Sequence, residues 1–352
     1  ILAVPATGHP PREVVNPADL AEIVGEVREA TPADVSAALE AAPAGFAEWS
    51  ATTPANRAAA LRRAADIYED QAPELAALAT REAGKTLTDA IAELREAVDF
   101  LRYYAEAAET TRGPARGVLV CISPWNFPLA IFTGQIAGAL AVGNAVIAKP
   151  AEQTPLIAAR ATELLHAAGI PRTALQLLPG DGPHVGAPLT EAPAIAGVVF
   201  TGSTEVAKAI DRALAEHAGP EAVLIAETGG INAMIVDSTA LPEQAVRDVL
   251  ASAFQSAGQR CSALRILYVQ HEARARLVEM LAGAADTLVV GDPWDPATDV
   301  GPVIDTDAEA GLAAYVAHPP GPLVKSLPAP GGGRFIGPAV LDVPGIAALQ
   351  RE

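Results

Sequence analysis

Cysteine and basic residues are both scarce in this sequence, and each shortage excludes a class of protein. The 352 residues include 2 cysteines, too few for the disulfide framework of a small secreted scaffold. The 24 lysines and arginines are outnumbered by 42 aspartates and glutamates, so the net charge is -18. A nucleic-acid-binding surface needs clustered positive charge. We therefore expect no nucleic-acid partner.

The sequence also has no segment typical of export or of a membrane span. The apolar start, Ile1–Pro5, is short and has no basic residues before it, unlike a signal peptide. The stretch 117–148 lacks charged residues and is long enough to cross a bilayer. Pro124, Pro128 and Gly138 interrupt it, which is typical of a buried strand, a loop and a buried helix. We expect a reduced, cytoplasmic protein without a membrane span.

The histidines carry no metal-binding pattern. The 6 histidines are scattered along the chain, without a paired cysteine or carboxylate at ligand spacing. Metal sites in proteins need several such ligands close together. We expect no metal.

Beyond residue 117, short apolar runs alternate with segments of helix length. The runs that suit buried strands are Val118–Ile122, Ala145–Ala148, Ala174–Leu178 and Gly197–Thr201. Pro155–Ala168 and Ser203–His217 suit helices between them. This alternation predicts an open α/β sheet of the Rossmann type, with ligands near the carboxyl ends of its strands.

The remaining parts of the chain differ from this pattern. The first hundred or so residues are typical of helices, one of them beginning at Pro54. Another is indicated by residues that share one helical face, namely Ile91, Leu94, Val98, Leu101 and Ala105.

A second strand–helix alternation begins at about Asn232, with Ala233–Val236 and Leu264–Val269 as strands. The length of the chain favours two domains, and we divide them as 1–228 and 229–352. Pro319–Gly333 is rich in proline and glycine and predicts a loop.

Two segments contain groups suited to covalent catalysis. Cys261 lies in the polar segment Ala257–Ala263, and Glu227 precedes a glycine pair. A thiol is readily made nucleophilic, and a carboxylate can activate water. Asn126, between two prolines, can donate a hydrogen bond to an oxyanion. Cys121, in an apolar run, fits a buried residue instead.

Each of these residues also has an ordinary structural role open to it. Cys261 can be a small buried residue, Glu227 a solvated carboxylate at a strand end, and Asn126 a turn residue. The sequence contains no Gly-x-Gly-x-x-Gly fingerprint, because the segment that begins at Gly180 has one residue too many. Gly202 and Ser203 open a helix where a pyrophosphate can bind, although Ser203 also suits a plain helix cap.

Taken in order, these motifs resemble the aldehyde dehydrogenase superfamily. The matching stretches are Cys121–Gln135, Lys149–Pro155, Phe200–Ser203, Ala226–Gly230 and Ala257–Ala263. The amino-acid sequences of these stretches are most similar to the glutamate-semialdehyde (pyrroline-5-carboxylate) dehydrogenase half of the bifunctional proline utilisation A enzymes. The resemblance implies that Cys261 is the nucleophile, that Glu227 is the general base and that Asn126 contributes to the oxyanion hole.

The resemblance also implies a cofactor and a substrate. It assigns NAD to Ile122, Ser123, Trp125, Lys149, Glu152, Gly180, Gly202, Ser203 and Glu352. A carboxylate at Glu152 suits the ribose hydroxyls of NAD and repels the 2′-phosphate of NADP. Ser262 and Phe127 are implied to bind glutamate γ-semialdehyde. Residues 1–228 then comprise N-terminal helices and the NAD-binding domain, and 229–352 the catalytic domain.

Two features depart from the family pattern. Ile231 stands where the proline utilisation enzymes carry glutamine, and the chain stops at Glu352, where further catalytic sequence is expected. We therefore expect a C-terminally truncated catalytic domain. The resemblance also implies a proline dehydrogenase, either fused or as a partner, and a homo-oligomer when complete. A different aldehyde substrate and a non-catalytic interaction domain are the alternatives.

Overall fold

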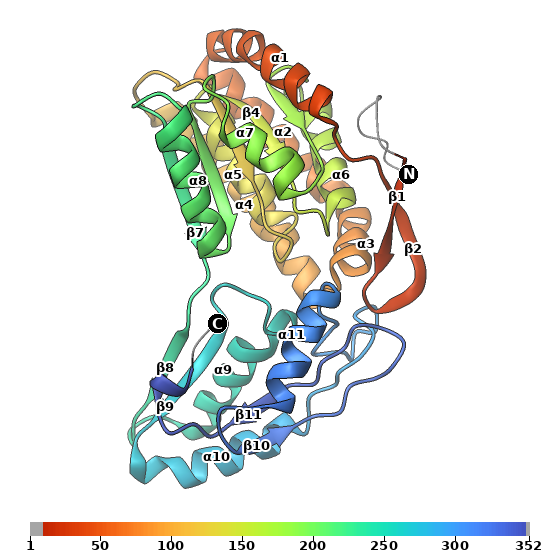
Figure 1. Ribbon diagram of the computed structural model, residues 1–352, viewed down its shortest axis with the longest axis vertical. Coiled ribbons are helices and arrows are strands. Elements are labelled where there is room, and N and C mark those ends of the chain that lie inside the picture. The colour runs from red at the N-terminus through yellow and green to blue at the C-terminus, as the bar shows by residue number, and fades with distance from the viewer. Residues whose placement is uncertain (1–9, 350–352) are drawn as a thin grey trace. The chain divides into compact units, whose positions relative to one another are not determined.

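The contacts of the computed structural model, which describes residues 10–349, divide the chain into two compact units (Figure 1). Among the described residues, the first unit takes those up to Val15, Ile23–Ala83 and Ala90–Thr228. The second takes Asn16–Glu22, Gly84–Asp89 and those from Gly229 onward. Two short segments from the N-terminal half thus belong to the second unit. The division into domains 1–228 and 229–352 stays a prediction.

A five-stranded parallel sheet forms the centre of the first unit. Its strands are β3 (Val118–Ile122), β4 (Ala145–Lys149), β5 (Leu175–Leu177), β6 (Gly197–Gly202) and β7 (Val223–Thr228). They lie in the order β5-β4-β3-β6-β7, and each neighbouring pair is parallel. The predicted α/β sheet is therefore confirmed, and the uncharged stretch 117–148 forms a strand, a loop, a helix and a strand.

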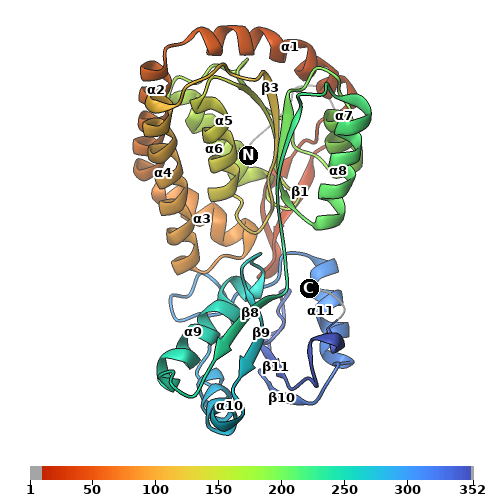
Figure 2. The same ribbon diagram turned by 90° about the vertical axis from the view of Figure 1, so that its left-hand side faces the viewer.

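Helices cover both faces of this sheet, as Figure 2 shows. One face packs on α2 (Pro54–Asp70), α3 (Ala72–Ala83), α4 (Leu87–Thr110), α5 (Ala130–Ala141) and α6 (Pro155–Ala167). The other packs on α1 (Pro32–Ala51), α7 (Ala187–Thr190) and α8 (Thr204–His217). Successive side chains of a strand point to opposite faces. In β3, Leu119 and Cys121 accordingly join the first cluster, and Val118 and Val120 join the second. Strands buried on both sides explain the unbroken apolar runs.

The predicted helix of residues 91–105 is present as part of α4, with one error in its buried face. Leu94, Val98, Leu101 and Ala105 are buried, but Ile91 is 54% exposed. Ala90, one position earlier, is buried instead, because at this turn it is Ala90 that lies on the buried face of the helix. The predicted start at Pro54 is confirmed, and the Thr53 hydroxyl caps α2 by accepting from the Asn56 N–H.

The expectation that the first hundred residues are helical is wrong for the start of the described chain. β1 (Arg12–Asn16) and β2 (Asp19–Val27) pair in a two-stranded sheet. Val14 and Val27 pack against Leu156 in a small apolar cluster. The β-branched residues of these segments favour strands, and burial of Val14 and Val27 stabilises them. The helical pattern begins only after these strands.

Two buried glutamates bind the first turns of α5 and α6. Glu82, on α3, accepts hydrogen bonds from the N–H groups of Leu156 and Ile157 at 2.6 and 2.8 Å. Glu93, on α4, accepts from those of Leu129 and Ala130 at 2.7 and 3.2 Å. Neither α5 nor α6 has a side-chain cap at its own N-cap position. Carboxylates from distant helices thus satisfy N–H groups that a helix leaves unpaired.

Stability should depend on pH through Glu82. Burial raises the pKa of this carboxyl from 4.5 to about 8, although the two N–H donors and Arg12 act in the opposite direction. The folded state then binds a proton that the unfolded state has lost between these two values. The Glu82 contribution to the free energy of unfolding should therefore fall as the pH rises from 4.5 to 8, and stay constant above.

Glu82→Gln, which does not titrate, is the matched comparison. Urea unfolding between pH 5.5 and 9 should show a stability difference between the native and variant proteins that declines up to about pH 8. A difference that is constant over this range would contradict a raised pKa.

The second unit contains a smaller α/β arrangement. Its elements are β8 (Asn232–Val236), α9 (Pro242–Phe254), a 3₁₀ turn (Gln255–Gly258), β9 (Leu264–Val269), α10 (His271–Ala285), α11 (Thr306–Ala317), β10 (Leu323–Ser326), β11 (Ala339–Leu341) and a short 3₁₀ turn (Ile346–Ala348). β8 and β9 are parallel, as the second predicted alternation requires, and β10 and β11 are antiparallel. The predicted loop Pro319–Gly333 is wrong in part, since it contains β10. Figure 1 shows α9 and α10 beside β8 and β9.

No helix among residues 10–349 combines the length and the apolar character needed to cross a membrane. The longest, α4, is charged along its exposed side.

Candidate active site

The strand order of the first unit reverses direction between β3 and β6. From β3 the chain continues to β4 and β5 on one side, and β6 is followed by β7 on the other. Ile122 pairs with Phe200 across this junction. The Gln135 amide donates to the Ile122 carbonyl at 3.3 Å and to the Thr201 hydroxyl at 3.1 Å. In open α/β sheets, ligands bind outside the carboxyl ends of the strands at such a reversal.

Most residues predicted for the site in this unit follow the carboxyl ends of these strands. Ser123, directly after β3, is 5% exposed, and its N–H donates to the Lys149 carbonyl at 3.1 Å. Trp125, Asn126 and Phe127 form the half-buried turn that leads to α5. Glu227 is exposed near the end of β7 and pairs in register with Thr201 of β6. The topology therefore brings these segments to one edge of the sheet.

The start of α8 is the helix N-terminus at this edge that suits an anion. Gly202 is the last residue of β6, and the exposed Ser203 caps α8, its hydroxyl accepting from the Val206 N–H at 3.2 Å. The first turns of α5 and α6 are bound instead by Glu93 and Glu82. Because a helix N-terminus attracts phosphate, the backbone of α8 fits the pyrophosphate that the sequence assigns to Gly202 and Ser203.

Lys149 and Glu152 lie close together after β4. Lys149 is 3% exposed, and its Nζ donates to the Pro150 carbonyl at 3.1 Å and lies 3.8 Å from Glu152 Oε2. Burial lowers the pKa of this ammonium, and the carboxylates of Glu152, Asp181 and Glu29 partly offset that effect. The half-exposed Glu152 carboxylate is available to accept bonds from hydroxyl groups.

The glycine-rich segment after β5 takes a form that the sequence does not reveal. Gly180 has a φ of +151°, and a Cβ there would lie 2.5 Å from Val185 Cγ2. Gly182–Gly186 is a single π-helical turn, capped by Asp181, which accepts from the His184 N–H at 2.7 Å. A Cβ on Gly186 would meet the Lys149 side chain at 3.6 Å. Asp181 is thus a charged neighbour of Lys149 that the sequence analysis missed. The order Asp-Gly-Pro could have indicated it, because aspartate is a common N-cap residue.

Cys261 lies in the second unit, on a turn between the end of α9 and β9. Its side chain and that of Ser262 are exposed. The Asn232 amide donates to the Cys261 carbonyl at 2.7 Å and to the Ala263 carbonyl at 3.0 Å. Asn232 therefore fixes the backbone on both sides of Ser262, although the residue before it departs from the family pattern.

The segment before this turn has unusual backbone angles. Ser256 and Ala257 have φ values of 53° and 55°, and Gly258 follows with 71°. Left-handed conformations of residues with a Cβ cost on the order of 1–3 kcal/mol each and persist only where surrounding contacts impose them. A Cβ on Gly258 would lie 2.8 Å from the Ala253 carbonyl, so this position requires glycine.

The two cysteines should differ sharply in reactivity. Cys121 is 1% exposed, and burial raises the pKa of its thiol to about 12, whereas Cys261 is exposed. The thiolate is the reactive form. Iodoacetamide should therefore alkylate Cys261 first in the native protein, as peptide mapping can measure. Faster labelling of Cys121 would overturn the assignment of nucleophile and buried residue.

The predicted site residues are distributed over both units. Asn126, Glu227, Phe127 and the NAD residues within the described range lie in the first unit. Cys261 and Ser262 lie in the second. Glu352 lies outside the described residues. Within residues 10–349, no group of three or more His, Cys, Asp or Glu side chains is placed to hold a metal ion.

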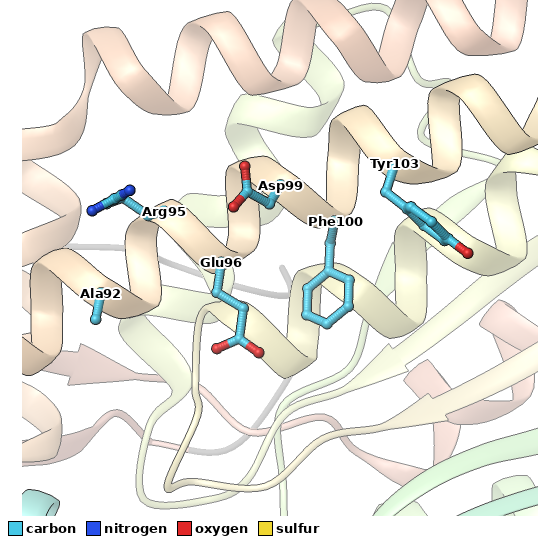
Figure 3. Close-up of a pocket in the computed structure, with 6 residues that line it drawn as sticks. All are labelled: Ala92, Arg95, Glu96, Asp99, Phe100 and Tyr103. Atoms are coloured by element: carbon cyan, nitrogen blue, oxygen red, sulfur yellow. The ribbon is translucent and has the colours of Figure 1, made fainter. Parts of the chain in front are cut away.

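An open groove of about 550 Å³ lies along α4 in the first unit. Figure 3 shows its lining residues, with Glu96 and Phe100 pointing to the same side of the helix. They are Ala92, Arg95, Glu96, Asp99, Phe100 and Tyr103. The predicted site residues within 10–349 are not among these six, so the groove has no assigned part in the site.

Comparison with known proteins identifies close relatives. The aldehyde dehydrogenase family profile matches residues 4–352. The bifunctional protein PutA of Escherichia coli K12 is 52% identical over 357 residues, covering 96% of this chain and 27% of its own length. The 1-pyrroline-5-carboxylate dehydrogenase of Geobacillus sp. WCH70 is 37% identical over 321 residues, covering 86% and 62%.

Comparison with solved structures also identifies a 1-pyrroline-5-carboxylate dehydrogenase. A 1-pyrroline-5-carboxylate dehydrogenase from Thermus, solved with bound NAD, has a TM-score of 0.90 and 36% sequence identity, over 97% of this chain and 71% of that one. The chain therefore spans about a quarter of the PutA protein and about two thirds of the single-activity dehydrogenases that it matches.

Proposed function

The chain belongs to the aldehyde dehydrogenase family, and on that basis we propose that it is the part of an enzyme that oxidises L-glutamate γ-semialdehyde to L-glutamate with NAD. The observation that carries the proposal is its identity of 37–52% to proteins named 1-pyrroline-5-carboxylate dehydrogenase and PutA, over most of the chain. The semialdehyde is the open-chain form of pyrroline-5-carboxylate. The reaction belongs to proline catabolism.

Cys261 is the nucleophile of this mechanism. Its thiolate attacks the aldehyde carbon, which forms a C–S bond and turns the carbonyl oxygen into an oxyanion. The Asn126 amide donates a hydrogen bond to that oxygen, together with the Cys261 backbone N–H. The exposed thiol supports this role, because an aldehyde must reach it.

Bound NAD would supply the acceptor for the hydride of the former aldehyde carbon, and loss of that hydride turns the Cys261 adduct into a thioester. Gly202, Ser203 and the first turn of α8 would hold its pyrophosphate, and Lys149 and Glu152 would hold the adenosine ribose. Ile122, Ser123, Trp125 and Gly180 would complete the nucleotide site. The start of α8 is capped by the Ser203 hydroxyl, whereas the starts of α5 and α6 are bound by buried carboxylates, and this difference supports the assignment.

Glu227 releases the product. Its carboxylate takes a proton from a water molecule while the water oxygen attacks the thioester carbon. The C–S bond then breaks, which frees the acid and restores the Cys261 thiolate, and Glu227 returns its proton to solvent. The exposure of Glu227 at the end of β7 supports access of water to this group.

Ser262 and Phe127 set the substrate preference. The Ser262 hydroxyl binds the carboxylate of the semialdehyde, and Phe127 packs on its methylene groups. As partners we propose a proline dehydrogenase, fused or associated, and further copies of the chain in a homo-oligomer; the likeness to bifunctional PutA proteins supports the first of these.

A substrate screen with the full-length protein tests this function. NADH formation should give a kcat/KM for glutamate semialdehyde at least about 10-fold above that for succinic semialdehyde, which lacks the amino group and one chain carbon, and for propionaldehyde. Equal or higher values for another aldehyde would assign a different substrate. The absence of NADH with every aldehyde would favour the non-catalytic alternative.

A further inference from the structure

The three left-handed residues before Cys261 are held by a carboxylate from a distant part of the chain. Asp89, at the start of α4, is 6% exposed and belongs with the second unit by its contacts. Its Oδ1 accepts from the Gln255 amide nitrogen at 2.6 Å. Its Oδ2 accepts from the Ser256 N–H at 3.2 Å and from the Ser256 hydroxyl at 3.1 Å. Asp89 thus binds the segment at the point where the left-handed conformation begins.

The geometry requires a carboxylate at this position. The Gln255 amide is oriented by Arg260, whose Nη1 donates to Gln255 Oε1 at 2.6 Å. The Gln255 nitrogen therefore faces Asp89 Oδ1, while a backbone N–H faces Oδ2. Both oxygens must accept, and only an ionised carboxylate offers two acceptors without a donor.

The other end of the segment is fixed independently. Arg265 donates to the Gly258 carbonyl at 2.8 Å. The Gln259 side chain donates to the Ser256 and Pro302 carbonyls at 3.1 and 3.2 Å and accepts from the Ile304 N–H at 2.9 Å. Asp89 consequently restrains the α9 end of a segment whose other end is already bound, together with Lys85, whose Nζ donates to the Ser256 hydroxyl at 3.4 Å.

We propose that Asp89 is a positioning residue for Cys261, because its carboxylate imposes the left-handed backbone of 256–258 and so sets where the thiol lies. The proposal rests on the proposed function, in which Cys261 is the nucleophile. A strained segment returns to ordinary angles when its restraint is removed, and displacement of a reacting group by about 1 Å can cost about 10²-fold in rate.

Asp89→Asn in the full-length protein is the test. The amide replaces one acceptor with a donor that faces an N–H group. We expect kcat to fall about 10²-fold with the KM for NAD unchanged, faster amide hydrogen exchange in 255–263, and an altered rate of Cys261 alkylation. Glu106→Gln, which removes a carboxylate from the exposed side of the same helix, is the control and should change none of these.

A purely structural role would lower the melting temperature of Asp89→Asn but leave the kcat of the folded protein unchanged, and that result would overturn the proposal. If Asp89→Asn does not fold, Ser256→Ala decides, since it removes one of the contacts; native kcat and exchange in that variant would count against Asp89. Retained turnover in Cys261→Ala would instead refute the proposed function, whatever the hydrogen exchange of Asp89→Asn shows.

Discussion

Replacing Cys261 with alanine is expected to remove aldehyde oxidation almost completely. Without the thiol, no covalent adduct forms, and hydride transfer has no tetrahedral intermediate to start from. Loss of a covalent nucleophile costs on the order of 10⁴–10⁶-fold in kcat in enzymes whose catalytic groups act as a unit. NADH formation by the full-length variant, at saturating semialdehyde and NAD, measures the effect.

Cys121→Ala is the matched control for this experiment. The Cys121 side chain is 1% exposed in β3 and packs in the main apolar cluster. Its truncation should lower the melting temperature, as removal of a buried atom does, and leave kcat within a few-fold of the native value. If Cys121→Ala lost turnover and Cys261→Ala kept it, the nucleophile would be misassigned.

Replacing Glu227 with glutamine is expected to slow turnover by roughly 10²–10⁴-fold, the range for loss of a general base. The amide keeps the size of the side chain but cannot take the proton of the attacking water. Thioester formation should persist in part, so rapid mixing should show a burst of NADH followed by a slow steady state.

Glu216→Gln, at an exposed position of α8, provides the charge-matched comparison and should show native steady-state turnover. A Glu227→Gln protein with an unchanged steady state would remove this residue from the mechanism. A variant that loses the burst as well would place Glu227 at an earlier step.

The inner strands of the parallel sheet were predictable because they are buried on both faces. Strands β3 and β4 give unbroken apolar runs, and the predicted bounds Val118–Ile122 agree with the structure at both ends. The predicted bounds Leu264–Val269 of β9, in the smaller sheet, agree as well, although this strand includes the exposed Arg265. The strands β1 and β2 were missed, because they are mixed in polarity and followed by long helical patterns. Local periodicity is a weak signal where burial is partial.

In the site, residues within a local motif could be predicted from the sequence, and residues joined by long-range contacts could not. The segments around Cys261, Glu227 and Asn126 are recognisable because their residue types and order carry chemistry. Asp89 was not recognisable, since its contact with Ser256 joins residues 167 positions apart. Glu82 and Glu93 were missed for this reason too: a glutamate in a helical pattern predicts a solvated side chain, and only the packing of another helix buries it.

The helix caps from Glu82 and Glu93 have a consequence for biosynthesis. Glu93 precedes the Leu129 amide that it binds by 36 positions, and Glu82 precedes that of Leu156 by 74. Because a ribosome makes the N-terminal part first, both carboxylates leave the exit tunnel before the helices whose first turns they bind. A circularly permuted chain that begins at Val118 would reverse this order. During its synthesis, the N-termini of α5 and α6 would stay unbound until α3 and α4 are made. The permuted chain should therefore aggregate more during synthesis than the native chain.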